Sequence, residues 1–131
     1  MCLKRLTKKV TLLEDITVYK VVTLRRDGEL FNPYTVSTGE VYNYKLGVNK
    51  ANTSVTLFVD DHRSEAKYES GFHCYTSMEG VEEEFMFWEN YCGAVLTATI
   101  PRGTVVQYGQ ESKYTVVVTP VLVINELPKE V

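Results

Sequence analysis

The sequence is poor in cysteine, and its few cysteines lie far apart. Its 131 residues contain three of them, Cys2, Cys74 and Cys92. Three dispersed cysteines do not make a disulfide framework or paired zinc knuckles, which argues for a reducing compartment. No apolar run approaches the roughly 20 residues that a membrane-spanning helix needs. We therefore expect a cytoplasmic protein with no membrane partner, in which Cys74 and Cys92 pack as small apolar side chains.

An excess of basic residues is also missing. The chain carries 14 lysine and arginine residues against 17 acidic residues, a net charge of −3. Without a global basic field there is little to attract duplex nucleic acid, so we expect no such partner. Basic residues do gather near the start, at Lys4, Arg5, Lys8 and Lys9. No apolar stretch accompanies them, so they predict a solvated arm and not a signal peptide.

The length fits one ordinary domain with one core. We expect a single domain over residues 1–131, in which 1–12 form the basic N-terminal arm and 125–131 a C-terminal tail. Residues 37–51 alternate too weakly to be assigned, and 60–70 fit either a short helix or a surface loop.

Several segments predict β-strands. Residues 16–24 (ITVYKVVTL) are rich in β-branched side chains, and Asp27-Gly28 is a hairpin signal that should return the chain antiparallel over 29–31. Further strand-like runs share this composition and lie at 54–59, 94–100, 104–108, 114–118 and 121–124.

One segment predicts a helix. Thr76 and Glu79 have the spacing of a capping box, and an apolar stripe then recurs at Val81, Phe85, Trp88 and Cys92 before Gly93. The connections are too short for parallel crossovers. The fold class we expect is therefore α+β, a mostly antiparallel sheet with one main amphipathic helix packed on it.

The residues before this helix suggest an anion site. Free N–H groups at a helix start attract anions, and His73 could add a proton donor there. Arg102, in the turn Pro101-Arg102-Gly103-Thr104, could hold a phosphate or carboxylate with two hydrogen bonds. The alternatives are a structural histidine with satisfied partners and an ordinary exposed turn arginine.

Lys20 and several tyrosines complete the candidate ligand-binding residues. Lys20 interrupts an apolar strand; alternation predicts that it faces solvent, and if it faces inward an anionic ligand could be its partner. Four tyrosines could stack on a base: Tyr19, Tyr34, Tyr75 and Tyr108.

Catalytic and metal motifs are absent from the sequence. There is no Walker A loop, dinucleotide fingerprint, or serine-hydrolase or kinase signature, and His62 and His73 lack metal-ligand spacing. We expect no catalytic residue, metal or cofactor. Cys2 could become an N-terminal nucleophile after loss of Met1, but enzymes of that kind use longer chains and more helices.

Several motifs together resemble a family of small uncharacterised proteins from phages and gut bacteria. The motifs are Met1-Cys2-Leu3, Asp15-Ile16, Tyr19-Lys20, Asn32-Pro33-Tyr34, Gly71-Phe72-His73-Cys74-Tyr75 and Ile100-Pro101-Arg102-Gly103-Thr104. The resemblance covers most of the chain. It implies a phage-type context but no activity.

The Pro101–Thr104 turn is also similar to a turn in the closing strands of ADP-ribosyltransferases. Such a transferase needs a late catalytic glutamate, yet Glu111 is the only acid from 94 to 124, and Tyr19-Lys20 does not match the residues that hold the dinucleotide. The resemblance therefore implies at most a degenerate, binding-only relative.

From these features we expect a cytoplasmic phage-type accessory protein that binds and sequesters a small anionic, nucleotide-like ligand, as sponge proteins do against host immune signalling. A homo-oligomer would provide a deep pocket most easily. The alternatives are an enzyme that acts on nucleotides and a protein-interaction module without a small ligand.

Overall fold

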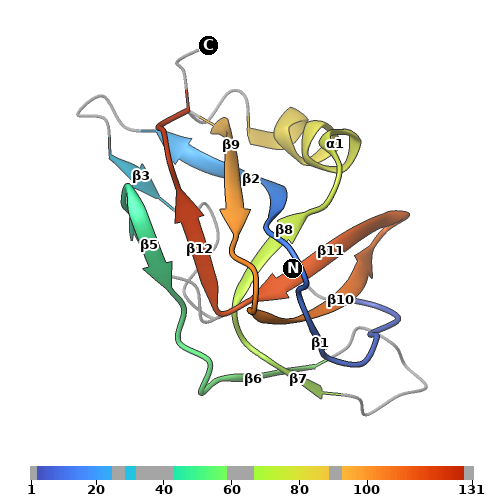
Figure 1. Cartoon of the computed structure of the whole chain (residues 1–131). Helices are drawn as coiled ribbons and strands as arrows, with labels where there is room; N and C mark the ends of the chain where they lie inside the picture. The colour runs from blue at the N-terminus through green and yellow to red at the C-terminus, as the bar shows by residue number, and fades with distance from the viewer. Residues whose placement is uncertain (1–2, 25–28, 32–42, 59–66, 89–92, 129–131) are drawn as a thin grey trace.

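The structure is a computed structural model, and it describes residues 3–24, 29–31, 43–58, 67–88 and 93–128. Within these ranges the chain forms twelve strands and one helix (Figure 1). In chain order they are β1 (Val10–Thr11), β2 (Ile16–Leu24), β3 (Leu30–Phe31), β4 (Asn43–Tyr44), β5 (Gly47–Lys50), β6 (Thr56–Phe58), β7 (Lys67–Glu69), β8 (Phe72–Tyr75), α1 (Met78–Trp88), β9 (Gly93–Ile100), β10 (Val105–Glu111), β11 (Tyr114–Thr119) and β12 (Val121–Ile124).

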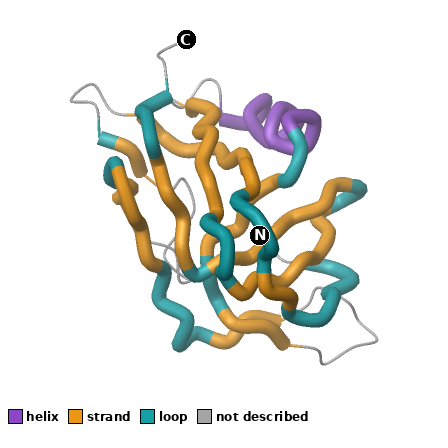
Figure 2. The backbone as a smooth tube through the Cα atoms, viewed as in Figure 1, coloured by secondary structure: helices purple, strands orange, loops and turns teal. Residues whose placement is uncertain are grey.

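The strands form one large, curled sheet and one small one. The large sheet has the order β1-β10-β11-β8-β2-β9-β12-β5, with β3 attached to β2 and β4 attached to β3. Strands β6 and β7 pair separately below it (Figure 2). Every described pairing is antiparallel. The expected class, mostly antiparallel sheet with a helix, is thus confirmed in outline, although α1 has only 11 residues.

Strand β2 is the centre of the large sheet. One edge of β2 pairs with the whole length of β9, from Ile16↔Ile100 to Thr23↔Gly93. The other edge pairs first with β8, at Tyr19↔Tyr75, and then with β3, at Leu24↔Leu30. The last pairing confirms the antiparallel return that Asp27-Gly28 predicts, while the turn itself lies outside the described residues.

The two faces of the sheet support two apolar clusters. Val18, Val22, Phe72 and Cys74 point to the concave side, where β12 and β10 also contribute, and Cys74 is buried there as expected. The alternate residues, such as Val21, point to the convex side, which α1 covers with its fully buried Val81. This division follows from the period-2 alternation of side chains along each strand.

The helix begins one residue later than the capping-box prediction. Its N-cap is Ser77, whose hydroxyl accepts the N–H of Gly80 (3.4 Å). The Thr76 hydroxyl instead donates to the carbonyl of Thr115 (3.4 Å). Thr76 is therefore bound to β11 and does not cap the helix. Phe85 packs against the convex cluster, whereas the Trp88 side chain and Cys92 lie outside the described parts.

The N-terminal segment differs from a solvated arm. Its basic side chains are exposed, but Lys4 exchanges both backbone hydrogen bonds with Gln110 (2.8 and 2.7 Å). Arg5 then adopts a left-handed conformation (φ 54°), as in a β-bulge. Leu3 is fully buried against Gly109, where a Cβ would lie 2.9 Å from Leu3 Cδ1. Apolar packing at Leu3 therefore fixes the segment to β10.

Residues 67–70, the described part of the stretch 60–70, also differ from the prediction. Residues Lys67–Glu69 form β7 and pair with β6, from Thr56↔Glu69 to Phe58↔Lys67. A helix or loop is thus wrong for these three residues. A strand of three residues is too short to show an alternation pattern, so local patterning does not reveal it.

A hydrogen bond joins α1 to the tip of the β10–β11 hairpin. The Tyr114 hydroxyl donates to the Glu83 carboxylate, which raises the pKa of Tyr114 above its ordinary value, while the nearby Lys113 ammonium opposes that rise. Lys113 Nζ lies 5.4 Å from the centre of the Tyr114 ring. The helix therefore contacts the hairpin through side chains of both charges.

Gly80 permits the close approach of α1 to the sheet. A Cβ at this position would lie 2.5 Å from Tyr75 Cδ1 and 3.1 Å from Tyr114 Cβ. Alanine normally stabilises a helix relative to glycine by about 1 kcal/mol. We expect the opposite here: Gly80→Ala should lower the free energy of unfolding by about 1–3 kcal/mol in urea titrations, because the added methyl group overpacks the contact.

The matched control for Gly80→Ala is Glu82→Ala, an exposed position on the same helix. This variant should stay within about 0.5 kcal/mol of the parent. Stabilisation by Gly80→Ala would show that α1 does not sit on Tyr75 as described.

Candidate functional site

Three polar side chains of β2, β7 and β8 are buried near one another, and Lys20 binds the main chain of His73 and not its ring. Lys20 and His73 are only 4% and 2% exposed, and Tyr68 is also buried. The Tyr68 hydroxyl lies 3.0 Å from His73 Nε2, and His73 Nδ1 lies 3.0 Å from the Gly71 carbonyl oxygen. The Lys20 ammonium donates to the His73 carbonyl oxygen at 2.8 Å. We call Lys20, Tyr68 and His73 the buried cluster.

The contacts of His73 fix its tautomer. A carbonyl oxygen can only accept, so Nδ1 must carry the proton that it donates to Gly71. Neutral Nε2 is then an acceptor, and the Tyr68 hydroxyl donates to it. Both ring nitrogens thus have protein partners. The structure agrees with the alternative of a structural histidine more closely than with a proton donor to an anion.

Lys20 does not face solvent, contrary to the prediction from alternation. It lies on the concave side with Val18 and Val22. The physical reason is a carbonyl within reach: β2 and β8 pair only at Tyr19↔Tyr75 among the described residues, and beyond that pair the His73 carbonyl accepts from the lysine. A main-chain acceptor therefore occupies a position that an anionic ligand was expected to fill.

Arg102 lies apart from the buried cluster. It is exposed in the turn after β9, and its backbone N–H donates to Asp15 Oδ1 (2.7 Å). The β2–β9 register places this turn beyond Ile100, beside the start of β2, whereas Lys20 contacts His73 from the middle of β2. The described contacts do not bring Arg102 and His73 to one anionic group.

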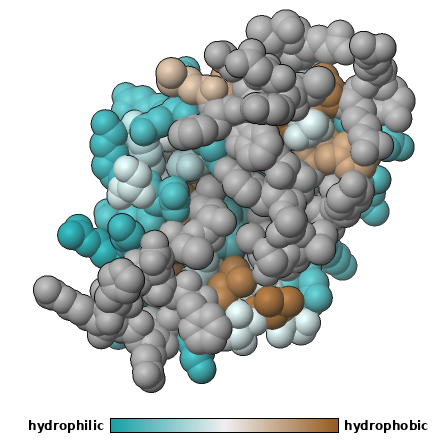
Figure 3. All heavy atoms as spheres, turned by 180° about the vertical axis from the view of Figure 1, so that it is seen from behind, coloured by the Kyte–Doolittle hydropathy of each residue, from teal (hydrophilic) through white to brown (hydrophobic). Residues whose placement is uncertain are grey.

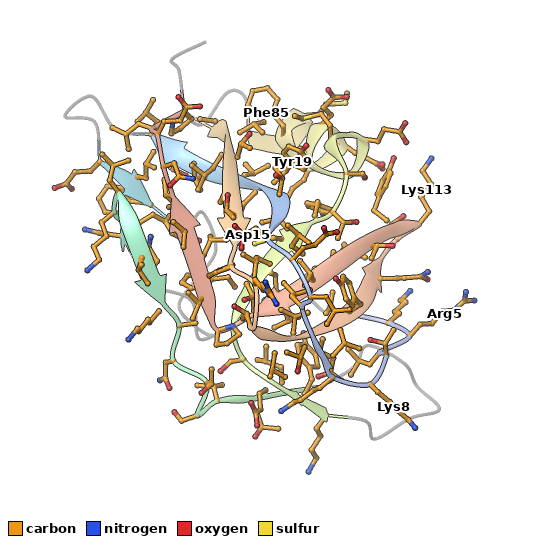
Figure 4. All side chains as sticks on the ribbon, viewed as in Figure 1. Arg5, Lys8, Asp15, Tyr19, Phe85 and Lys113 are labelled. Atoms are coloured by element: carbon orange, nitrogen blue, oxygen red, sulfur yellow. The ribbon has the colours of Figure 1, made fainter. Side chains whose placement is uncertain are left out.

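The tyrosines do not share one pocket. Tyr75 is buried under α1, edge-on to Tyr114 with ring centres 6.4 Å apart. Half-buried Tyr19 lies on the same side, below Phe85 (Figure 4). Tyr108 packs against the concave cluster, and Tyr34 lies outside the described residues. The rings of Tyr19, Tyr75 and Tyr108 are therefore divided between the two faces of the sheet.

Two concave regions lie elsewhere. One, of about 240 Å³, lies between β1, β7, β10 and β11 and includes Lys9 and Glu69 in its lining. These two side chains form an exposed ion pair with Nζ and Oε1 3.1 Å apart. Among the described residues of this lining Lys9 is the only basic one, and it is already compensated by an acid, so these residues offer an anion little net charge.

The second concave region has a different electrostatic character. It has a volume of about 530 Å³ and is lined by five residues of the β4–β5 region, Asn43, Lys45, Val48, Asn49 and Lys50. We call it the Lys45–Lys50 pocket. Its described lining contains two exposed lysines and no carboxylate. Its volume falls within the range of about 300–1,000 Å³ that is typical of small-molecule sites.

Asn49 holds the shape of the Lys45–Lys50 pocket. This residue is buried, and its Oδ1 accepts the backbone N–H of Lys45 at 3.0 Å. Its Nδ2 donates to the carbonyls of Lys45, Gly47 and Leu122 at 2.8, 3.2 and 3.4 Å. Gly47 has φ +91°, a conformation that favours glycine. The Asn49 amide thus fixes the turn between Lys45, which precedes the edge strand β5, and Lys50, which ends it.

Sequence reasoning missed this pocket. The lysines fall in the stretch 37–51, which gave no clear strand pattern, and no motif singles them out. The available signal was a glycine turn with a lysine two residues before it and another three residues after it. That pattern is common at exposed turns, so it carries little information without the position of Asn49.

The described ranges contain neither a metal-binding cluster nor a membrane-spanning helix. No group of three or more His, Cys, Asp or Glu side chains there could hold a metal ion. No helix in the same part of the chain is long and apolar enough to cross a lipid bilayer.

Comparison of the chain with protein-family models, with curated proteins and with solved structures gave no match. Functional inference therefore has to come from the geometry and charge of the described residues.

The buried cluster has a structural role that can be measured. Tyr68→Phe removes the hydrogen bond to His73 Nε2 at a buried position, so it should lower the free energy of unfolding by about 1–3 kcal/mol. Tyr19→Phe is the control, because Tyr19 is half-buried and should change stability by no more than about 0.5 kcal/mol. Equal stability of the two variants in urea titrations would show that the Tyr68–His73 bond does not support the fold.

Proposed function

We propose that the protein binds a small anionic ligand of the nucleotide class in the Lys45–Lys50 pocket and sequesters it without chemical change. The observation that carries the proposal is the pair of lysines in a concave region whose described lining contains no acid. A phosphate group placed there would meet two ammonium groups and displace only solvent from them.

The volume of the pocket supports a ligand of limited size. A region of about 530 Å³ can take a mononucleotide-sized molecule, and the uncharged Val48 side chain offers an apolar wall beside the two lysines. Asn49 uses its amide on the protein backbone, so it acts as a positioning residue and not as a ligand contact. The phage-type, cytoplasmic role of a sponge protein is part of the same proposal and draws on the family resemblance.

The proposal predicts which lysines affect binding. Lys45→Ala and Lys50→Ala should each weaken the binding of a nucleoside monophosphate about three- to tenfold, a modest loss because exposed charges are screened by water. Lys9→Ala is the matched control: it removes one exposed lysine from the other concave region and should leave the dissociation constant unchanged. Isothermal titration calorimetry at low ionic strength measures all three.

A second experiment separates sequestration from the alternative functions. The protein is incubated with nucleoside mono-, di- and triphosphates and cyclic dinucleotides, then heat-denatured, and the supernatant is analysed by chromatography. Intact ligand supports sequestration, and altered ligand would establish an enzyme instead. Absence of binding by every compound, or equal losses for Lys9→Ala and Lys45→Ala, would contradict the proposed pocket.

A further inference from the structure

Acidic side chains predominate on α1, and basic side chains predominate in the N-terminal segment at another end of the molecule. The exposed residues of α1 include Glu79 and Glu82, whereas the N-terminal segment exposes Lys4, Arg5 and Lys8. In Figure 4, Arg5 and Lys8 lie at the far end of the molecule from Phe85 of α1. The two groups therefore cannot neutralise each other within one chain.

The acidic region of α1 also exposes apolar side chains. Met86 is 71% exposed and Met78 is 41% exposed. Spacings of four and eight residues place Met78, Glu82 and Met86 along one side of the helix, next to Glu79. We call these four residues the α1 surface. Methionine is enriched at protein interfaces because its flexible thioether adapts to a partner.

The N-terminal segment has the complementary character. Leu13 is 88% exposed and Val10 is 42% exposed, close in sequence to the three basic residues. The Lys4–Gln110 hydrogen bonds hold the segment on β10, so these side chains are displayed on a fixed backbone. We call Lys4, Arg5, Lys8, Val10 and Leu13 the basic surface.

Two other charged side chains already have partners within the chain. Lys9 is paired with Glu69, and Glu83 accepts a hydrogen bond from Tyr114. Neither belongs to the two surfaces just defined. Seen from behind (Figure 3), the described atoms on the left, the side that carries α1, are mainly hydrophilic with a few less polar residues among them. This surface is more polar than an obligate interface, which resembles a domain core, so a contact formed on it is weak.

We infer that the α1 surface of one copy binds the basic surface of a second copy of this chain. The occupant follows from complementarity: both surfaces combine exposed apolar side chains with charge, and their charges are opposite. Because the two surfaces on each chain differ, a head-to-tail contact between them closes into a ring or continues as an open filament. Two copies can also form a twofold pair in which each surface contacts the other. The contact does not involve the Lys45–Lys50 pocket, so it stands apart from the proposed function.

The first test uses the unmodified protein. Sedimentation velocity should show an average mass that rises with concentration at about 20 mM NaCl and falls to the monomer mass at about 500 mM NaCl, because the Debye length shrinks from about 20 Å to about 4 Å. A monomer at both salt concentrations, up to protein concentrations of about 100 µM, would overturn the inference.

The second test exchanges the charges. A variant with Lys4→Glu, Arg5→Glu and Lys8→Glu, and a variant with Glu79→Lys and Glu82→Lys, should each be monomeric at low salt. Their equimolar mixture should associate again, since every unlike pair of surfaces is restored between the two variants. Circular dichroism confirms that each variant is folded. A mixture that stays monomeric, or single variants that associate as the parent does, would show that these surfaces do not meet.

Discussion

Burial of the Lys20 ammonium is the constraint on which the arrangement of the sheet depends. An unpaired charge in the interior costs several kcal/mol, so the lysine must have a polar partner wherever the sheet places it. The His73 carbonyl provides one at 2.8 Å, at the point where β2 exchanges β8 for β3 as its neighbour. The hydrogen bond from Lys20 to His73 thus connects β8 to β2 beyond Tyr19↔Tyr75, the one pair described between these strands.

Several features follow from that tie. Strand β8 leads directly into α1 through Ser77, so the position of β8 determines where the helix covers the convex side. His73 can present its carbonyl to Lys20 because its ring is held from both ends, by Gly71 and by Tyr68 of β7. This hydrogen bond and the Lys9–Glu69 ion pair both connect the small β6–β7 sheet to the rest of the protein.

Polar side chains have different roles in the buried cluster and in the Lys45–Lys50 pocket. His73 and Lys20 have the residue types of an anion site, yet their described hydrogen bonds end on protein atoms. The lysines at positions 45 and 50 are exposed instead, and the buried Asn49 amide holds the turn between them. In both regions a buried side chain organises the backbone; only at the β4–β5 turn does the result face solvent as a concave, cationic surface.

Local sequence signals predicted the strands whose identity is set by composition. Strand β2 matches residues 16–24, and β9 to β12 follow the expected runs, because β-branched residues and tight turns act over short distances. Strand β7 pairs with β6, the strand before it, but its three residues are too few to show an alternation pattern. The pairing of Lys4 with Gln110 and the inward direction of Lys20 depend on partners that lie far along the chain. The pocket escaped prediction for the same reason, since Asn49 reaches Leu122 across the sheet.

The most direct measurement is a two-dimensional ¹H–¹⁵N NMR titration of the unmodified protein with a nucleoside monophosphate at low ionic strength. Binding in the Lys45–Lys50 pocket predicts that the amide signals of Lys45, Gly47, Asn49 and Lys50 shift together with one dissociation constant, while those of Arg102 and Lys9 stay in place. Shifts that centre on Arg102 or on Lys9, with the β4–β5 turn unaffected, would contradict it.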